Sequence, residues 1–356
     1  MNRAFWLGKK VLVTGHTGFK GSWLSCWLQA MGADVVGYAL APQSGANLFH
    51  EADVGAGMVS VEGDVRDLEH LTRVMQEHQP QIVLHLAAQA LVRRSYDDPV
   101  FTYTTNVIGS VNLLEAVRRT PGVRAVVMVT SDKSYANQEW VWAYRETDRL
   151  GGRDPYSSSK ACAELVVQAY RDSFFPVNRY SEHGVAVATA RAGNVIGGGD
   201  HGADRLIPDI IRALLEPRPV MIRSPDATRP WQFVLEAICG YLVLAEHLWN
   251  EGPKVSESWN FGPDSDDVKP VSWVADYMTR RWSDDARWIS DQGLHPHEAN
   301  LLMLDCTKAK KLLGWRPRLR LPMTLDWIIE WNRTALAQGS MRATLDDQIR
   351  RYEVLS

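Results

Sequence analysis

The sequence predicts an α/β fold, with a doubly wound parallel sheet and a smaller C-terminal lobe. Through the first half of the chain, short runs of apolar, mostly β-branched residues alternate with segments of helical spacing. After about residue 191 glycine and proline become frequent and the apolar runs shorten. We therefore expect a sheet domain over residues 1–190, with return segments near 230–262, and a lobe formed mainly by residues 191–356.

The expected elements follow from apolar runs and their spacing. Continuous apolar runs are typical of parallel strands that are covered on both faces. The predicted strands are residues 10–14, 34–38, 81–86, 125–130 and 185–189. The predicted helices are residues 21–31, 67–77, 99–118, 155–171, 204–215, 235–249, 271–282 and 307–313.

Composition excludes several classes of protein. The 356 residues carry 39 Lys and Arg against 42 Asp and Glu, a net charge of −3, so the basic surface of a general nucleic-acid binder is absent. Uncharged stretches such as residues 237–245 reach about half of the roughly 18 residues that a membrane span requires. The four cysteines are far apart, and Lys9 and Lys10 stand where a signal peptide would be apolar, so we expect a reducing cytoplasm.

A glycine-rich loop follows the first predicted strand with G-x-x-G-x-x-G spacing. Glycines allow positive φ and a close approach of the backbone to a pyrophosphate, whose charge the N-terminus of the next helix can stabilise. A tight structural turn is the alternative, but the position after the first strand of an alternating pattern favours a dinucleotide. The predicted cofactor loop comprises Gly15, His16, Thr17, Gly18, Phe19, Lys20 and Gly21.

Two further segments are predicted to contact the same cofactor. Asp64 and Val65 follow a third strand, where the carboxylate can accept from an adenine amino group; a loop-capping Asp64 is the alternative. Ala87 and Ala88, after the fourth strand, offer a small surface beside the cofactor. The second strand ends without an acidic residue for a ribose 2′-hydroxyl or an arginine for a 2′-phosphate. NAD is favoured, and Lys20 leaves NADP open.

A catalytic group is predicted where the fifth strand ends. Tyr156 and Lys160 are four residues apart, so on a helix they share one face, and both also border the expected cofactor site. The ammonium can lower the pKa of the phenol so that it acts as a base, while the Ser131 hydroxyl holds the substrate oxygen. A Y-x-x-x-K pair is common by chance, but its combination with the glycine loop and with this serine is specific.

These motifs resemble the extended short-chain dehydrogenase/reductase family over essentially the whole chain, which implies a Rossmann cofactor domain. Asp132 and Lys133, directly after the serine, resemble the pair that handles elimination in nucleotide-sugar 4,6-dehydratases, although the branch acting on thymidine-diphosphate sugars has Asp-Glu there. The runs 14–21 and 131–156 are similar to the branch acting on CDP-glucose. A further family-like run, residues 191–200, is followed by His201 in place of a common tryptophan.

The resemblance implies the chemistry of a hydro-lyase. Tyr156 would take the proton of the sugar 4-hydroxyl while NAD+ oxidises carbon 4. Asp132 would protonate the departing 6-hydroxyl, and Lys133, neutralised by burial and by the Lys160 charge, would remove the carbon-5 proton. Lys133 could instead only form hydrogen bonds while another group acts as the base. The product would be a 4-keto-6-deoxy sugar nucleotide for deoxysugar synthesis, as in lipopolysaccharide O-antigens.

The second lobe is expected to bind a nucleotide sugar. Asn194, Arg205 and Arg229 match the family's phosphate and nucleotide contacts, although each could be a surface residue. The predicted helices 99–118 and 155–171 resemble the family's dimer-forming pair, which implies a homodimer and leaves a higher oligomer open.

Other possibilities remain open at this point. Two histidines within residues 295–298 flank a proline and lack the spacing of a helical metal site, so we expect no metal. Another nucleotide-sugar dehydratase or a 4-epimerase would share the fold and the triad. Asp132 and Lys133 argue against an epimerase, which needs no acid at carbon 6. A non-catalytic NAD-sensing scaffold is a third possibility, against which the intact triad argues.

Overall fold

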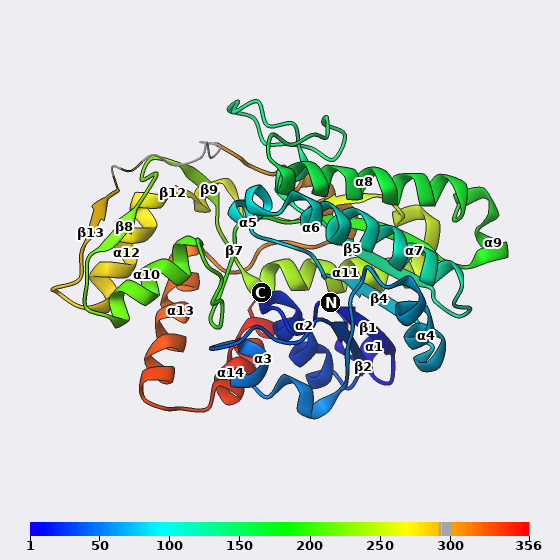
Figure 1. Ribbon diagram of the computed structural model, residues 1–356, viewed down its shortest axis with the longest axis horizontal. Coiled ribbons are helices and arrows are strands. Elements are labelled where there is room, and N and C mark those ends of the chain that lie inside the picture. The colour runs from blue at the N-terminus through cyan, green and yellow to red at the C-terminus, as the bar shows by residue number, and fades with distance from the viewer. Residues whose placement is uncertain (292, 294–300, 356) are drawn as a thin grey trace.

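A seven-stranded parallel sheet forms the centre of the computed structural model, which describes residues 1–291, 293 and 301–355 (Figure 1). The strand order is β11-β6-β5-β4-β1-β2-β3, so the chain moves outward in both directions from β1 and β4. This confirms the predicted doubly wound sheet. The strands are β1 (Lys10–Thr14), β2 (Asp34–Ala39), β3 (Val59–Glu62), β4 (Ile82–His85), β5 (Ala125–Val129), β6 (Ala186–Arg191) and β11 (Ser258–Asn260).

The sheet is buried on both faces because successive side chains point to opposite sides. In β1, Val11 and Val13 belong to one apolar cluster and Leu12 belongs to the other. In β4, Val83 likewise faces the cluster opposite to that of its neighbours. The register pairs Val11 with Val35 of β2 and with Ile82 of β4. All the strands therefore end at one edge of the sheet, where the loops meet.

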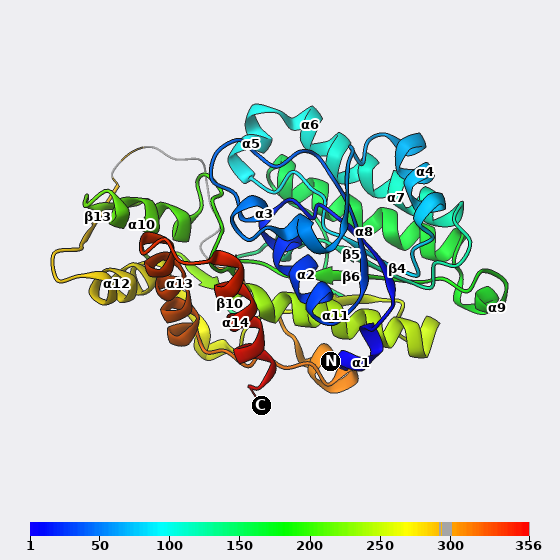
Figure 2. The same cartoon turned by 90° about the horizontal axis from the view of Figure 1, so that it is seen from below.

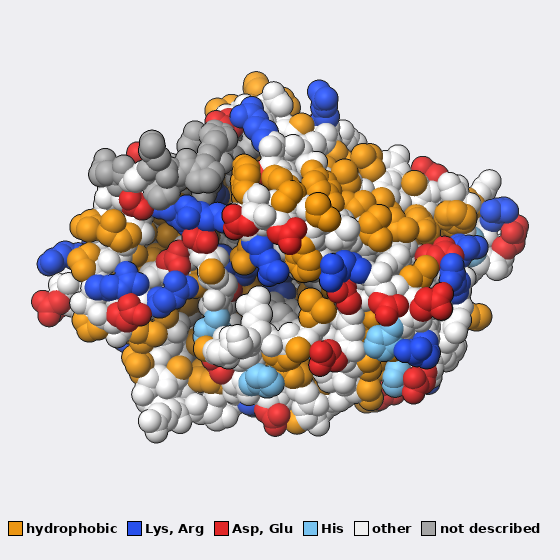
Figure 3. All heavy atoms as spheres, viewed as in Figure 1, with side chains coloured by type: hydrophobic (Ala, Val, Ile, Leu, Met, Phe, Trp, Pro, Cys, Tyr) orange, Lys and Arg blue, Asp and Glu red, His pale blue; other side chains and the backbone are white. Residues whose placement is uncertain are grey.

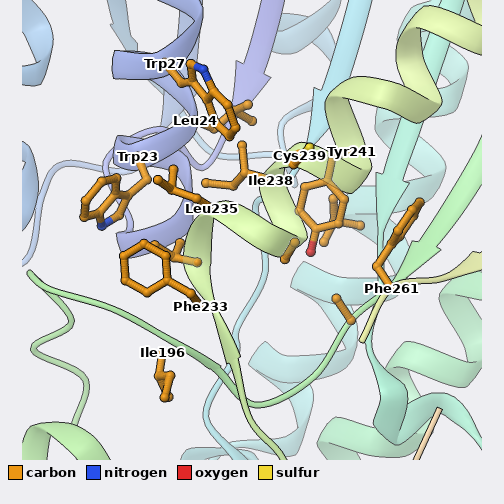
Figure 4. Packing of buried hydrophobic residues seen from close by; sticks show 14 of the residues in the cluster. Trp23, Leu24, Trp27, Ile196, Phe233, Leu235, Ile238, Cys239, Tyr241 and Phe261 are labelled. Carbon is orange, nitrogen blue, oxygen red and sulfur yellow. The ribbon is translucent and has the colours of Figure 1, made fainter. Parts of the chain in front are cut away.

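Two layers of helices cover the sheet. One layer contains α2 (Phe19–Ala30) and α11 (Val234–Glu251), whose aromatic and aliphatic side chains share a core that includes Trp23, Trp27 and Phe233 (Figure 4). The other layer contains α4 (Leu68–His78), α7 (Gly109–Arg118) and α8 (Pro155–Ser173). The predicted helix over 99–118 is divided in the structure into α6 (Pro99–Tyr103), a π-helical turn (Thr104–Ile108) and α7.

The remaining elements include a lobe beside the sheet (Figure 2). The other helices are α1 (Arg3–Trp6), α3 (Leu48–Glu51), α5 (Val92–Asp97), α9 (Tyr180–His183), α10 (Leu206–Leu215), α12 (Val271–Trp282), α13 (Leu321–Leu336) and α14 (Met341–Glu353). The short strand pairs are β7 (Val195–Ile196) with β10 (Gln232–Phe233), β9 (Thr228–Pro230) with β12 (Val268–Pro270), and β8 (Val220–Ile222) with β13 (Trp288–Ser290).

The C-terminal part of the chain returns to the sheet domain. β11 pairs with β6, and α11 packs against β5 and β6. The buried carboxylate of Glu236 on α11 accepts hydrogen bonds from the Leu319 amide at 2.6 Å and from the Tyr352 hydroxyl at 2.7 Å, which fixes α14. Within the described residues, no helix is both long and apolar enough to cross a lipid bilayer.

Candidate active site and cofactor cleft

The glycine loop is closely packed against the sheet. Gly15 has a φ of +74°, and a Cβ there would lie 2.8 Å from the Ala87 nitrogen. A Cβ on Gly21 would lie 2.1 Å from the Gly15 carbonyl oxygen. Gly18 caps α2 without a side-chain hydrogen bond, so the first amides of the helix carry no capping side chain. The loop thus provides the close backbone and the helix N-terminus that a dinucleotide pyrophosphate needs.

Two side chains of this loop enter the protein interior. His16 is fully buried, and its Nε2 lies 2.7 Å from the Ser60 hydroxyl; burial lowers the pKa of His16 to about 4. Burial, followed by the charges of Lys160 and Arg205, lowers the pKa of Lys20 to about 7. Lys20 therefore lies within the electrostatic reach of the catalytic group, a position that the sequence did not indicate.

The two further segments predicted to contact the cofactor follow β3 and β4. Asp64 accepts from the Arg66 backbone amide at 2.9 Å and from its guanidinium at 2.5 Å, and this hydrogen bond lowers the pKa of the carboxyl. The structure therefore gives Asp64 the loop-capping contact. Val65 is buried against Gly109, and the Ala87 amide donates to the Thr14 hydroxyl at 3.2 Å. Ala88 follows it and is half-buried.

The serine and its two neighbours form a compact turn after β5. Ser131 caps a one-turn 3-10 helix (Asp132–Ser134), and its Oγ accepts from the Lys133 amide at 3.2 Å. The Ser131 hydroxyl donates to Oδ1 of Asp132 at 3.1 Å, while Lys133 Nζ lies 3.5 Å from the same oxygen. The Asp132 carboxylate is fully buried, whereas the Lys133 side chain is 33% exposed. The desolvation expected for a lysine base is therefore incomplete.

The tyrosine and lysine lie in the first two turns of α8, where the predicted shared face is present. Asp154 caps this helix and Pro155 occupies its first turn, which places Tyr156 at the start and Lys160 one turn later. Burial raises the pKa of Tyr156, and the largest opposing contribution comes from Lys133. The sequence predicted that Lys160 lowers the pKa of Tyr156, but Lys160 is not among the main contributions to this pKa. Lys160 Nζ instead donates to the Val129 carbonyl at 3.3 Å, and burial lowers its pKa to about 8.

A buried ion pair behind this group was missed by sequence reasoning. Glu164, four residues after Lys160, accepts from Arg191 Nη2 at 2.7 Å, and both side chains are almost completely buried. Arg191 Nη1 also donates to the Tyr135 hydroxyl at 2.8 Å. The i+4 spacing from Lys160 could have indicated Glu164, because it repeats the helix face.

Of the three residues predicted to bind the substrate, one contacts the catalytic group directly and two bind other groups of the protein. Asn194 Nδ2 donates to Asp132 Oδ2 at 3.2 Å, so its amide reaches the catalytic group. Arg205 pairs with Asp200 at 3.0 Å and also influences Lys20. Arg229 Nη1 donates to a neighbouring carbonyl on β9.

Two further sequence features have limited bearing on the site. His201 Nε2 lies 3.0 Å from a Glu51 carboxylate oxygen. Residues 295–298, with the two histidines, lie outside the described residues. Among the described residues, no cluster of three or more histidine, cysteine, aspartate or glutamate side chains could hold a metal ion.

Comparison with known proteins identifies the family to which this arrangement belongs. The family model of GDP-mannose 4,6 dehydratase matches residues 12–326, which include the glycine loop, the turn after β5, α8 and most of the lobe. The chain belongs to the GDP-mannose 4,6 dehydratase family.

Three relatives illustrate the range of this dehydratase family and its neighbours. CDP-glucose 4,6-dehydratase of Salmonella typhimurium strain LT2 is 54% identical over 333 residues, which cover 94% of this chain and 93% of that protein. The structure of UDP-glucose 4-epimerase from Thermotoga maritima with UDP-glucose has a TM-score of 0.79 at 25% identity and covers 92% of this chain and 99% of its own. The structure of MoeE5 in complex with UDP-glucose and NAD has a TM-score of 0.76 at 25% identity, with the same two coverages.

Proposed function

We propose that the protein is a CDP-glucose 4,6-dehydratase that converts CDP-D-glucose to CDP-4-keto-6-deoxy-D-glucose and water. The observation that carries the proposal is the placement of Asp132 and Lys133 on one turn with Ser131, where the charges of both side chains act on the pKa of Tyr156. An acid and a base beside the oxidising group are what dehydration requires in addition to oxidation. The 54% identity to the Salmonella typhimurium CDP-glucose 4,6-dehydratase supports CDP-glucose as the substrate.

NAD is the cofactor that fits the glycine loop. The tight packing of Gly15 and Gly21 leaves the loop backbone and the α2 N-terminus to hold the pyrophosphate, with Asp64 and Ala87 beside it. The complex of MoeE5 with NAD supports this assignment. When bound, NAD+ would accept a hydride from sugar carbon 4 and later return it to carbon 6. We accordingly propose that residues 1–190, with the return segment, bind the cofactor and that residues 191–356 mainly bind the sugar nucleotide.

The oxidation step depends on α8 and on the turn after β5. The Tyr156 phenolate would remove the proton of the 4-hydroxyl, and the Ser131 hydroxyl would donate a hydrogen bond to the same oxygen. Because burial raises the pKa of Tyr156, the phenolate depends on nearby positive charge, to which Lys133 contributes most while it is protonated. The Lys133 side chain is 33% exposed, so it would release this proton to solvent before it acts as a base in the next step. Lys160, anchored on the Val129 carbonyl, adds a second buried cation whose pKa is about 8.

The elimination step depends on the carboxylic acid and the lysine. Once carbon 4 is a ketone, the carbon-5 hydrogen is acidic, and neutral Lys133 would remove it as a proton. The carbon 6–oxygen bond then breaks, and protonated Asp132 gives its proton to the leaving hydroxyl, which departs as water. Lys133 afterwards returns a proton to carbon 5 as carbon 6 is reduced.

Positively charged and amide side chains of the lobe would hold the diphosphate. Asn194, Arg205 and Arg229 are the candidates, since guanidinium groups bind phosphate oxygens through paired hydrogen bonds. Arg205 lies near enough to influence both Lys20 and Tyr156, so a phosphate bound to it would lie close to the catalytic group.

The substrate assignment is tested by incubating the protein and NAD+ with CDP-, dTDP-, UDP- and GDP-linked hexoses. We expect mass spectrometry to detect loss of one water from CDP-glucose, at least about tenfold faster than from the other glucose nucleotides. Dehydration of another nucleotide sugar at the higher rate would overturn the base preference. Formation of an isomer without loss of water would favour a 4-epimerase instead.

We also propose that the protein forms a homodimer through α6, α7 and α8. Exposed hydrophobic side chains gather over these helices (Figure 3), including Val100 at 71%, Ile108 at 48% and Leu165 at 55% exposure. Such a face is stabilised by burial against a second copy. Light scattering should give twice the chain mass, and Leu165→Glu should give the monomer. The control Val354→Glu, at an exposed residue near the C-terminus, should leave the dimer intact.

We propose a cytoplasmic protein that serves deoxysugar synthesis for a lipopolysaccharide O-antigen. All four cysteines are free thiols, and burial raises the pKa of three of them, Cys26, Cys239 and Cys306. A reducing compartment suits unpaired, unreactive thiols. Cell fractionation would test the location.

A further inference from the structure

The buried carboxylate of Asp132 is held on two sides. Its Oδ1 faces the Ser131 hydroxyl at 3.1 Å and Lys133 Nζ at 3.5 Å. Its Oδ2 faces the chain that leaves the neighbouring strand β6, where Asn194 Nδ2 donates to it at 3.2 Å. A Cβ on Gly193 would lie only 1.8 Å from the same Oδ2, so the carboxylate rests directly on that glycine.

The segment that holds Oδ2 is itself firmly anchored. Asn194 has a φ of +48°, at the point where the chain leaves β6 and enters β7. Its carbonyl accepts from the Gln232 amide at 3.2 Å, and the Gln232 side chain donates to the Gly193 carbonyl at 3.1 Å. Asparagine tolerates this left-handed conformation better than most residues. Hydrogen bonds from Gln232 of β10 thus hold the left-handed turn in place, and this turn directs the Asn194 amide at Asp132.

The two oxygens of Asp132 are therefore not equivalent. An amide N–H can only donate, so Oδ2 must offer a lone pair to Asn194. The transferable proton of Asp132 then belongs on Oδ1, the oxygen that faces Ser131. Ser131 is also one of the groups that lower the pKa of Tyr156 by hydrogen bonding to the phenol oxygen. The Ser131 hydroxyl is thus the group that can link the phenol to Oδ1.

The overall reaction needs such a path. In dehydration, carbon 5 loses one proton to Lys133 and later regains one, so this exchange supplies no net proton to recharge the acid. The 4-hydroxyl loses a proton that the product ketone never regains, and the departing hydroxyl gains one to become water. The proton collected by Tyr156 is therefore the one that balances the loss from Asp132.

We propose that Asn194 is a positioning residue that fixes the proton of Asp132 on Oδ1, so that the 4-hydroxyl proton passes through Tyr156 and Ser131 to the departing 6-hydroxyl. This inference rests on the proposed dehydratase function. It adds a role for Asn194 in the elimination step that is separate from contact with the substrate phosphate. In each transfer an O–H bond breaks at the donor as one forms at the acceptor, and the carbon 6–oxygen bond breaks with the last transfer.

The test compares Asn194→Gly and Asn194→Asp with the wild type in single turnovers of CDP-glucose with NAD+. Both replacements suit a positive φ, so the backbone turn is retained, while the amide donor is lost. Gln338→Gly is the matched control, because Gln338 is exposed, has a φ of +56° and lies outside the site. Acid-quenched samples are analysed by mass spectrometry for the 4-keto sugar before and after loss of water, and CDP affinity is measured by calorimetry.

We expect the dehydration rate constant to fall about 10- to 100-fold in both Asn194 variants, as for loss of a hydrogen bond to a charged group. Oxidation should change less than about threefold, so the 4-keto-glucose nucleotide accumulates. In an Asp132→Asn background, Asn194→Gly should have no further effect on dehydration, because its partner is already changed. A merely structural role would lower both steps and would add to the effect of Asp132→Asn.

The results separate the inference from the function on which it rests. A wild-type protein that does not dehydrate CDP-glucose contradicts the proposed function. If the wild type dehydrates CDP-glucose, the Asn194 variants decide about the positioning role. Variants that keep the wild-type ratio of oxidation rate to dehydration rate and lose only CDP affinity would overturn this role. Asn194 would then be a phosphate contact only. Gly193→Ala is a second approach, since its methyl group would displace the whole Asp132 carboxyl group while Asn194 remains, and it should also accumulate the ketone.

Discussion

The buried ion pair between Glu164 and Arg191 predicts that Glu164→Gln lowers the free energy of unfolding. In the structure the Glu164 carboxylate accepts from Arg191 at 2.7 Å and from Thr189 at 2.8 Å, with 1% of its side chain exposed. Removing the charge leaves the Arg191 guanidinium buried without its counter-ion, which typically costs about 3–5 kcal/mol. Because glutamine keeps the shape and one acceptor oxygen, we expect a loss of about 3 kcal/mol in the free energy of unfolding.

The assay is urea unfolding at neutral pH with the double variant Glu164→Gln/Arg191→Met alongside the single one. Replacing both partners removes the uncompensated charge, so the double variant should be no less stable than Glu164→Gln. The control is Glu115→Gln, which breaks a surface pair with Arg118 and should cost less than about 1 kcal/mol. Equal losses for Glu164→Gln and Glu115→Gln would refute the reasoning about the buried charge.

The same substitution has a pH signature. Burial raises the pKa of Glu164, but Arg191 and the hydroxyl donors outweigh this and bring it below its ordinary value of 4.5. The carboxylate therefore stabilises the fold above about pH 4.5, and this contribution is lost as the pH falls through the folded-state pKa. The stability difference between wild type and Glu164→Gln should narrow on acidification. A difference that is constant from neutral to acid pH would contradict an ionised Glu164.

A related effect should reach the lysine one turn away. Burial lowers the pKa of Lys160 to about 8, and the Glu164 charge opposes that shift. Without this charge the pKa of Lys160 falls further, so its ammonium deprotonates at lower pH. We expect the alkaline limb of the rate profile to move toward neutral pH in Glu164→Gln. An unmoved limb would show that the carboxylate does not influence Lys160.

Three further predictions concern the catalytic group and the glycine loop. Tyr156→Phe should lower the oxidation rate by about 10² to 10⁴ with nearly unchanged NAD+ affinity, and full turnover would remove Tyr156 from the mechanism. Lys20→Ile should tighten NAD+ binding in calorimetry by relieving crowding in the loop, an idea that unchanged or weaker affinity would reject; His16 is left in place because its ring is fully buried against Ser60. Asp132→Asn and Lys133→Met should both stall at the 4-keto sugar, and Lys133→Met should also form it more slowly, because Lys133 opposes the raised pKa of Tyr156. Only Asp132→Asn should still exchange the carbon-5 hydrogen with solvent deuterium. Wild-type exchange in Lys133→Met would exclude Lys133 as the base.

The elements that the sequence predicts well are those set by local patterns. The buried strands, the glycine loop and the helix bearing Tyr156 and Lys160 follow from apolar runs, glycine spacing and capping residues that are close together in the chain. The division of the 99–118 helix by a π-helical turn was not predicted, because one additional residue in a turn leaves the apolar pattern almost unchanged. α13 and α14 were also missing from the predicted elements.

The sequence by itself determined which groups are available for the reaction, and the tertiary structure decided which of them act on one another. Asn194 reaches Asp132 across 62 positions of the chain only because β5 and β6 are neighbours and the chain turns at a positive φ. In the same way, Lys133 rather than Lys160 has the largest opposing effect on the pKa of Tyr156. Electrostatic interactions depend on distance and burial in three dimensions, and neither quantity can be derived from spacing along one helix.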